Sequence, residues 1–219
     1  MKQNIPEKGA VVQRDGETYA IKVHMPGGYT NPAELRRVAD VAERHGIPEI
    51  KITIAQRIGL FGIPEERLDA VRADLGDLGE GGTGLCIRYV KMCPGASWCK
   101  RAQQVTRDVG MEMDRRYHRL KVPWKFKMSV SGCTNDCCEG FIRDLALIGG
   151  PTGWKIMVGG NGGSRPRLAQ VLVEDLETDA EALAVVDRLV SWFAAAGKKC
   201  RIGKLVEELG IDALRKEVL

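Results

Sequence analysis

Residues 130–150 read VSGCTNDCCEGFIRDLALIGG, two apolar segments on either side of a glycine-flanked run that contains three cysteines. Short apolar segments bounded by turn residues are typical of buried strands, and GCTNDCCEG has the composition of a tight loop. Cys133 and Cys137 have three residues between them. The stretch therefore predicts a strand, a cysteine-bearing loop and a second strand.

A second cysteine pair lies upstream in MCPGASWCKRA (residues 92–102), where five residues separate Cys93 from Cys99. Two pairs with this spacing, with glycine and proline beside them, favour an iron–sulfur cluster, because each sulfur must reach a different iron. Zinc is an alternative, but structural zinc sites usually place paired cysteines two to four residues apart. The four cysteines therefore predict a redox site.

A disulfide framework is a further alternative, and two observations oppose it. Seven cysteines is an odd number, and residues 1–20 lack the apolar core of a secretory signal. We therefore expect a cytoplasmic protein whose thiols stay reduced.

Composition and charge limit the partners. The chain has 219 residues, a length that suits one large domain or two small ones, and 44% of the residues are hydrophobic, as in an ordinary globular protein. No apolar run approaches the roughly 18 residues that a membrane span requires, and 33 basic and 29 acidic residues give a net charge of only +4. We therefore predict neither a membrane partner nor a nucleic-acid partner. The basic excess is local, between Lys100 and Lys127, and indicates either a solvated helix face or an anion site.

The N-terminal part predicts an α+β half-domain of ferredoxin-like type over residues 1–80. Asn31 as N-cap, Pro32 after it and Glu34 predict the start of a helix that ends before Gly46. The other expected elements are strands at residues 18–24 and 49–55 and a short helix at 64–76. The glycine-rich residues 76–84 mark the expected boundary.

The remaining residues, 81–219, predict a mixed α/β domain. Thr178 with Glu181 forms a capping-box pattern, and Gly197 closes the helix that follows. The expected strands are residues 85–92, 124–132, 141–150, 153–160 and 167–174, and the expected helices are residues 98–116 and 180–196 with one or two short helices in 203–219.

These motifs carry a family resemblance. CPGASWC, GCTNDCCEGFIRDLALIGG and the later GGNGGSRPRL (residues 159–168) resemble the sirohaem and 4Fe-4S half of the sulfite and nitrite reductases, over roughly residues 84–175. Upstream, IKITIAQRIGLFGI (residues 50–63) resembles the segment that ends the family's small ferredoxin-like half-domain. Two-repeat members are more than twice as long, so the resemblance implies a compact single-repeat version.

The resemblance implies sirohaem and a 4Fe-4S cluster as cofactors. It implies a six-electron reduction of sulfite to sulfide, with nitrite to ammonia as the alternative, and a cofactor must carry either reaction. Cys137 is the implied bridge to the sirohaem iron, and the adjacent Cys138 is the competing candidate. Cys86 and Cys200 fit no ligand spacing and are expected to be buried apolar residues. The implied cluster ligands are Cys93, Cys99, Cys133 and Cys137.

Catalytic candidates on the substrate side are cations, because an anion must bind and gain protons there. Lys125 and Lys127 in PWKFK match the family's lysine-bearing strand and lie two residues apart, so we expect them to point the same way. Arg88 matches an active-site arginine. A second family arginine aligns with Ala55, and Arg57, two residues on, is expected to substitute for it.

Asn135 matches an asparagine that the family places near the sirohaem. Asparagine is also favoured in turns with left-handed backbone, so a turn residue is the alternative. Arg165 and Arg167 follow a glycine-rich loop that resembles the one clasping sirohaem carboxylates. The lysines and the cysteines share one repeat, so one hypothesis is a homodimer that exchanges lysines, and the other is a monomer with an open sirohaem face. No dinucleotide fingerprint stands out, so we expect a separate electron donor such as a ferredoxin.

Two other classes remain open at this point. A 4Fe-4S electron carrier would hold the cluster alone and would not need Lys125, Lys127, Arg165 or Arg167. A zinc-dependent nucleic-acid binder would use the basic stretch after Cys99 and would bind in a salt-sensitive manner.

Overall fold

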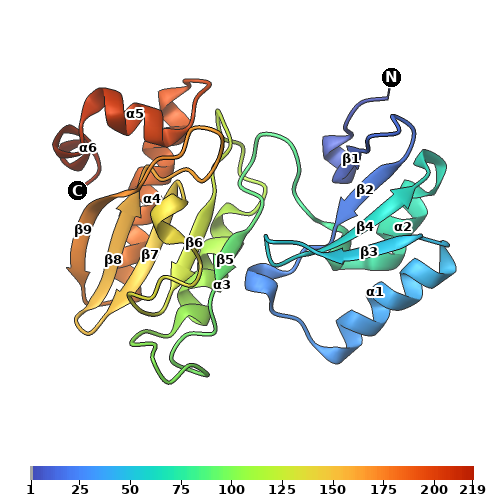
Figure 1. Ribbon diagram of the computed structural model, residues 1–219, viewed down its shortest axis with the longest axis horizontal. Coiled ribbons are helices and arrows are strands. Elements are labelled where there is room, and N and C mark those ends of the chain that lie inside the picture. The colour runs from blue at the N-terminus through green and yellow to red at the C-terminus, as the bar shows by residue number, and fades with distance from the viewer. Residues whose placement is uncertain (1) are drawn as a thin grey trace. The chain divides into compact units, whose positions relative to one another are not determined.

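A computed structural model describes residues 2–219, which divide into two compact units, the first ending at Gly84 and the second covering Leu85–Leu219. Each unit has its own sheet and its own helices (Figure 1). Both units combine helices with strands, so the predicted α+β class is confirmed.

The first unit is a four-stranded antiparallel sheet in the order β1-β2-β4-β3. Two helices, α1 and α2, contribute Val38 and Val71 to a core that also contains Tyr19, Ile21 and Leu60. The elements are β1 (Ala10–Val12), β2 (Tyr19–Lys22), α1 (Pro32–Arg44), β3 (Glu49–Ile52), β4 (Ile58–Ile63) and α2 (Leu68–Leu75), with 3-10 turns at Pro6–Lys8, Pro26–Gly28, Glu65–Arg67 and Gly76–Gly79.

The predicted start of α1 is confirmed. The Glu34 amide donates to Asn31 Oδ1 at 3.0 Å, and the Asn31 amide donates to Glu34 Oε2 at 3.2 Å, which completes a capping box. The strand predicted over residues 49–55 is too long, because β3 ends at Ile52. A turn follows, in which the Thr53 amide donates to the Arg57 carbonyl at 2.8 Å, and Ala55 lies in this turn.

The second unit has a five-stranded mixed sheet in the order β5-β6-β7-β8-β9. The first three strands are parallel, and β8 pairs antiparallel with both β7 and β9. Helices α3 and α4 cover one face of the sheet (Figure 1). The elements are β5 (Val90–Met92), α3 (Thr106–Tyr117), β6 (Met128–Ser131), a 3-10 turn at Gly140–Ile142, β7 (Leu145–Gly150), β8 (Gly153–Val158), β9 (Gln170–Leu176), α4 (Asp179–Ala196), α5 (Ile202–Leu209) and α6 (Ile211–Val218).

The helix predicted to begin near Trp98 begins instead at Thr106, where α3 starts. Residues 98–105 form a loop because their polar groups find partners outside a helix. The amides of Gln103 and Gln104 both donate to the carbonyl of Gly132, at 2.7 and 3.1 Å. These tertiary hydrogen bonds outweigh the helical preference of the local sequence. Among residues 2–219, no helix has the length and apolar character that crossing a bilayer requires.

The core of the first unit can be tested separately from the second. Leu60 on β4 is 0% exposed, and Leu60→Ala should destabilise this unit by about 2–5 kcal/mol through lost burial and a residual cavity. Hydrogen exchange followed by mass spectrometry should show faster exchange in β2 and β4. Ile52→Ala is the control, since Ile52 is 79% exposed on the neighbouring strand. Equal effects of the two variants would contradict this core assignment.

Candidate functional site

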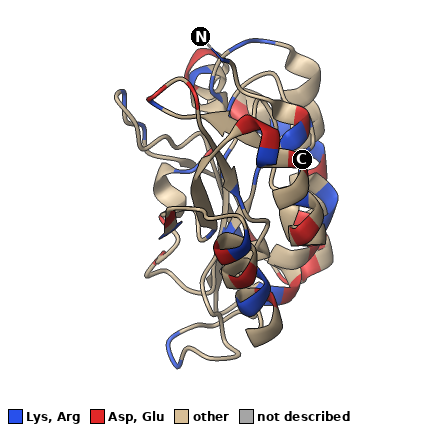
Figure 2. Cartoon of the chain, turned by 90° about the vertical axis from the view of Figure 1, so that its right-hand side faces the viewer, with Lys and Arg blue, Asp and Glu red and all other residues tan. Residues whose placement is uncertain are grey.

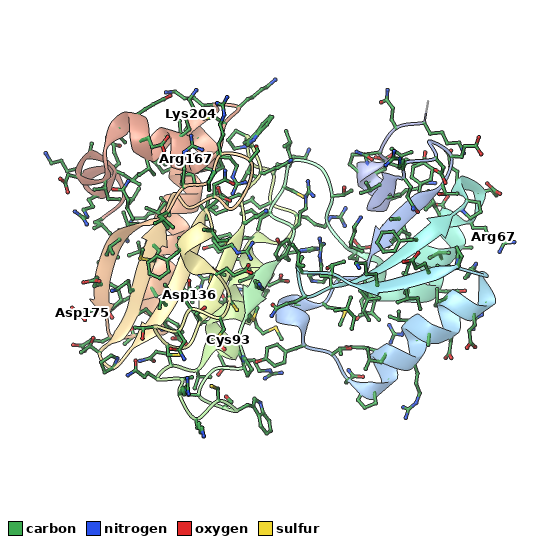
Figure 3. The ribbon with its side chains drawn as sticks, viewed as in Figure 1. Arg67, Cys93, Asp136, Arg167, Asp175 and Lys204 are labelled. Atoms are coloured by element: carbon green, nitrogen blue, oxygen red, sulfur yellow. The ribbon has the colours of Figure 1, made fainter. Side chains whose placement is uncertain are left out.

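Both cysteine pairs leave the second sheet at the same edge. Cys93 directly follows β5, and Cys133 follows shortly after β6. Because β5 and β6 are parallel, with Val90 opposite Met128, the loops after them meet at their carboxyl ends. We call this edge the cysteine end, made of residues 93–105 and 132–139. Figure 3 labels Cys93 and Asp136 in this region, on adjacent segments.

The two cysteine loops are held together by backbone hydrogen bonds. In addition to accepting from the first loop, Gly132 donates its amide to Cys93 Sγ at 3.1 Å. A Cβ at Gly132 would lie 2.8 Å from the Gln104 carbonyl oxygen and 3.1 Å from Gly95 Cα. Only glycine fits this close approach, so the sequence GC at 132–133 is required by the packing of one loop on the other.

The second cysteine loop is organised around Asp136. Its carboxylate accepts hydrogen bonds from Ser131 Oγ at 2.9 Å and from the Phe141 amide at 3.0 Å. Asp136 has φ +47°, so the left-handed residue expected at Asn135 is its neighbour instead. Asn135 itself is exposed near the tip of the loop.

The cysteines differ in exposure and ionisation. Cys93, Cys99 and Cys133 are half-buried, whereas Cys137 is exposed. The pKa of Cys93 is lowered to about 5, first by a hydrogen bond from the Cys138 thiol and further by the Gly132 amide. The same bond, together with burial, raises the pKa of Cys138. Cys93 is therefore a thiolate at neutral pH, which is the form that ligates metals.

The two remaining cysteines lie outside these loops. Cys86 is buried, as predicted, at 8% exposure. Cys200 is only half-buried, so the expectation of a buried apolar residue was wrong there. Cys200 lies in the irregular segment between α4 and α5, where no core packing closes over it.

The arrangement of the thiols fits a cluster better than a single zinc ion. Zinc–sulfur bonds of about 2.3 Å would bring four tetrahedral sulfurs to roughly 4 Å from one another. Over the described residues 2–219, no three cysteine sulfurs lie within 4.8 Å of one another. Partly buried sulfurs spread over two interlocked loops, one of them receiving an amide hydrogen bond, suit a larger iron–sulfur group.

Lys125 and Lys127 lie just before the N-terminal end of β6, opposite to the end that carries the cysteines. The strand predicted for residues 124–132 is too long, because β6 begins only at Met128. Phe126 is buried, and its ring centroid is 5.1 Å from that of Phe193 on α4. The two lysines therefore alternate with a core residue and point to the opposite side, Lys125 exposed and Lys127 half-buried.

A buried carboxylate organises this end of the sheet. Asp144 is 0% exposed and accepts from Arg201 Nε at 2.7 Å, from Arg201 Nη2 at 2.6 Å and from the Lys127 amide at 2.7 Å. Burial raises the pKa of Asp144 to about 6, and Arg201 opposes that rise. Burial first, and then the neighbouring Arg201 and Arg143, lower the pKa of the Lys127 ammonium. Cationic charge is thus concentrated around one carboxylate.

We call this region the basic end: Arg88, Lys125, Lys127, Arg143, Asp144 and Arg201. Sequence analysis did not identify Arg143, Asp144 or Arg201. An aspartate at the start of an apolar strand is a signal for a buried ion pair. Its partner Arg201, 57 residues later, cannot be identified from sequence spacing.

A polar path links the two ends of the sheet. Lys91 Nζ lies 3.1 Å from Glu139 Oε2, and Arg143 pairs with the same carboxylate. Arg143 Nε also donates to the Cys138 carbonyl at 3.3 Å. The loop that carries Cys138 is thereby tied to the residue that precedes Asp144.

The predicted catalytic and cluster residues do not all lie together. Lys127 and Cys133 lie at opposite ends of β6, and the six residue steps between them would span at most about 20 Å if fully extended. Arg88 lies just before β5, on the lysine side, and is half-buried. Arg57 belongs to the first unit, where it is buried and lines a pocket of about 400 Å³ together with Leu35 and Ile52.

The glycine-rich loop with Arg165 and Arg167 is also at the basic end. The Gly159 amide at its start donates to the Asp144 carbonyl at 3.0 Å. Arg167 forms an ion pair with Glu207 on α5 at 2.7 Å, whereas Arg165 is exposed. Figure 3 labels Arg167 at the side of the sheet opposite to Cys93.

The buried ion pair should be a major source of stability for the second unit. Arg201→Met leaves Asp144 buried without its cation and should lower the free energy of unfolding by about 3–5 kcal/mol. All four tryptophans follow residue 84, so urea unfolding followed by tryptophan fluorescence reports on this unit. Arg115→Met is the matched control, because Arg115 is 72% exposed in its pair with Glu112. A stability equal to that of the control would contradict the role of the pair.

Comparisons with known proteins agree on one family. The model of the nitrite/sulfite reductase ferredoxin-like half domain matches residues 11–78, and that of the nitrite and sulphite reductase 4Fe-4S domain matches residues 83–219. The chain is 38% identical over 217 residues to an assimilatory-type sulfite reductase of Nitratidesulfovibrio vulgaris, covering 97% of each chain. It is 37% identical over 185 residues to an NAD(P)H nitrite reductase of Bacillus subtilis, covering 84% of this chain but 23% of that one.

Solved structures show the same fold. The NirA protein of Mycobacterium tuberculosis superposes with a TM-score of 0.79 at 22% identity, covering 98% of this chain and 43% of that one. A dissimilatory sulfite reductase I superposes with a TM-score of 0.82 at 17% identity, covering 92% and 69%. The chain therefore belongs to the nitrite and sulfite reductase family, as a ferredoxin-like half-domain followed by the 4Fe-4S domain, and the cofactors of that family are sirohaem and a 4Fe-4S cluster.

Proposed function

We propose that this oxidoreductase reduces sulfite to sulfide. The observation that carries the proposal is the match over 97% of both chains to an assimilatory-type sulfite reductase. Curated nitrite reductases are similar in sequence, but the chain spans only about a quarter of their length. Reduction of nitrite to ammonia is the second candidate, supported by identities of 32–37% to those proteins.

Four cysteines would hold the cluster: Cys93, Cys99, Cys133 and Cys137. Cys137 is the exposed member of the set, and its thiol is open to a second group, which supports it as the bridge to sirohaem. Cys138 is 2% exposed, and its thiol is hydrogen-bonded to Cys93, which disfavours Cys138 as the bridge. When bound, the coupled cofactors would relay electrons from the donor to the anion and would provide its binding position.

The basic end would handle the anions and the protons. Lys125, Lys127 and Arg88 offer positive charge to an oxyanion, and fixed cations stabilise charge that develops during reduction. The lowered pKa of Lys127 makes its ammonium a better proton donor. Asn135 and Arg165 are exposed and available to sirohaem, and Arg167 would first have to exchange its Glu207 partner for a cofactor carboxylate. Arg57 is buried in the first unit, and its role at the substrate stays a prediction.

The separation along β6 supports site completion by a second copy. The lysines and the cysteines lie at opposite ends of β6, and a lysine side chain is shorter than this strand. In a homodimer, the lysines of one copy would complete the site of the other. A separate one-electron carrier such as a ferredoxin would supply the electrons.

Cofactor content is the first test. The purified protein should show haem-type absorption bands together with iron and acid-labile sulfide. Cys137→Ala should lose the coupling of the two cofactors, seen as an altered electron paramagnetic resonance spectrum, because the bridging sulfur is gone. Cys138→Ala is the matched control and should retain iron, sulfide and the coupled spectrum. If Cys138→Ala lost the coupled spectrum and Cys137→Ala kept it, Cys138 would be the bridging residue. A colourless protein that contains zinc would refute the proposed function.

Turnover tests the substrate and the lysines. With electrochemically reduced methyl viologen, kcat/KM should be higher for sulfite than for nitrite. Lys125→Ala and Lys127→Ala should each lower kcat/KM by roughly 10²-fold, because a proton donor or a fixed charge is removed. Lys216→Ala on the exposed side of α6 is the control and should behave like the wild type. A higher kcat/KM for nitrite would refute sulfite as the preferred substrate and would support the second candidate function.

Co-expression distinguishes the homodimer from the monomer. The doubly substituted Lys125→Ala and Lys127→Ala chain and the Cys137→Ala chain should each be inactive. In a lysine-exchanging dimer, a mixed pair contains one site with intact cysteine and intact lysines, so activity should reappear. Continued inactivity of the mixed species would leave each chain to supply its own lysines.

A further inference from the structure

The loop between β5 and α3 exposes an aromatic residue beside two cations. Trp98 is 81% exposed, a large apolar area for a residue that usually buries most of its surface. Lys100 and Arg101 follow at once and are also exposed. Over residues 94–105 the chain contains no aspartate or glutamate. We call Trp98, Lys100 and Arg101 the Trp98 patch.

The positive charge of the Trp98 patch is not neutralised by its own unit. Within residues 2–219, neither Lys100 nor Arg101 forms an ion pair. The acids of the adjacent cysteine loop are engaged elsewhere, since Asp136 accepts from Ser131 and Glu139 pairs with Lys91. Figure 2 shows the lowest loop coloured blue at its tip with no red beside it.

Other cations of the basic stretch are used differently. Arg115 and Arg116 on α3 both pair with Glu112, and Arg116 also pairs with Asp187. These arginines belong to a solvated helix surface with balanced charge. Lys100 and Arg101 differ from these arginines, because within residues 2–219 they have no acidic partner.

The position of the patch relates it to electron transfer. Trp98 and Lys100 are the two neighbours of Cys99 in the sequence. Cys99 is half-buried, and its amide is held by the Gly95 carbonyl at 2.8 Å. A protein resting on Trp98 would thus lie beside a cluster ligand without entering the substrate side, which is at the other end of the sheet.

We propose that the Trp98 patch is the docking surface for the electron donor, a small acidic protein that carries one electron at a time. The inference rests on the proposed function and adds the donor's location and chemistry. Tryptophan and arginine are the residues that most often dominate interface energy. Long-range attraction between the cations and an acidic carrier raises the association rate and falls with salt. Redox encounters of this kind bury less than about 1,200 Å² and dissociate readily.

Each docking event would deliver one electron from the reduced carrier through the Cys99 region, and the carrier would leave oxidised. Six such events, with six protons from solvent, convert one hydrogen sulfite ion into one hydrosulfide ion and three waters. A transient complex suits this sequence, because the carrier must leave before the next one binds.

The test uses the whole protein with its cofactors and a reduced plant-type [2Fe-2S] ferredoxin as the probe. Lys100→Glu with Arg101→Glu should raise the dissociation constant for ferredoxin, measured by calorimetry, and the KM for ferredoxin by roughly tenfold or more. Trp98→Ala should raise both as well. Its fold-change relative to the wild type should vary little with ionic strength, because both cations remain. Activity with methyl viologen, which needs no docking protein, should stay within twofold of the wild type. Lys216→Glu on α6 is the matched charge control and should leave ferredoxin binding unchanged.

Several results would overturn the docking surface. An unchanged dissociation constant in the charge-reversed variant would do so, as would an equal effect of Lys216→Glu. If the wild type self-associates in sedimentation and the charge-reversed variant does not, the patch binds a second copy instead. If Trp98→Ala loses its iron, the charge-reversed variant still decides the matter.

The binding measurement also separates this inference from the proposed function. Ferredoxin affinity is measured without substrate, so a protein that reduced neither sulfite nor nitrite would still give a dissociation constant. Weakened ferredoxin binding by the variants of such a protein would support the docking surface and refute the reductase function. Tight ferredoxin binding by all variants, with normal methyl viologen activity, would refute the docking surface and support the reductase function.

Discussion

The hydrogen bonds around Gly132 are the constraint on which the candidate site depends. Its carbonyl accepts two amides from the first cysteine loop, and its own amide donates to Cys93 Sγ. Parallel pairing of β5 with β6 brings both loops to one edge, but it does not fix their relative position. The Gly132 bonds do, and they also explain why residues 98–105 remain a loop. A site for a group with four thiolate ligands requires this precision before the group arrives.

The basic end is built on a different principle. Its cations repel one another, and the half-buried Lys127 is costly to keep charged. Asp144 offsets that cost by holding the guanidinium of Arg201 and the backbone of Lys127 at once. The carboxylate is fully desolvated, so it is stable as an anion only while Arg201 remains in place. The C-terminal segment is therefore part of the site, although it carries no recognised motif.

Sequence analysis predicted most of the elements because their signals are local. Asn31 and Thr178 begin helices through capping boxes that a four-residue window reveals. It failed where distant contacts decide the conformation: the Gly132 carbonyl binds the amides of Gln103 and Gln104 outside a helix, and the Arg57 carbonyl ends β3 before Ala55. The cysteine spacing pointed to a cluster for the same local reason. Arg201 was missed because its partner Asp144 is 57 residues away, beyond any periodic signal.

The two ends of the sheet separate the two demands of a multi-electron reduction. Electrons must reach the cluster from a surface that another protein can touch, whereas anions and protons need partly desolvated cations. The cysteine end has exposed loops and the unneutralised Lys100 and Arg101, and the basic end has the half-buried Lys127 near Asp144. Within one copy the two ends lie at opposite ends of the parallel strands β5 and β6. Electrons and protons must meet at one atom, and the proposed homodimer would meet that requirement by letting the lysines of one copy complete the site of the other.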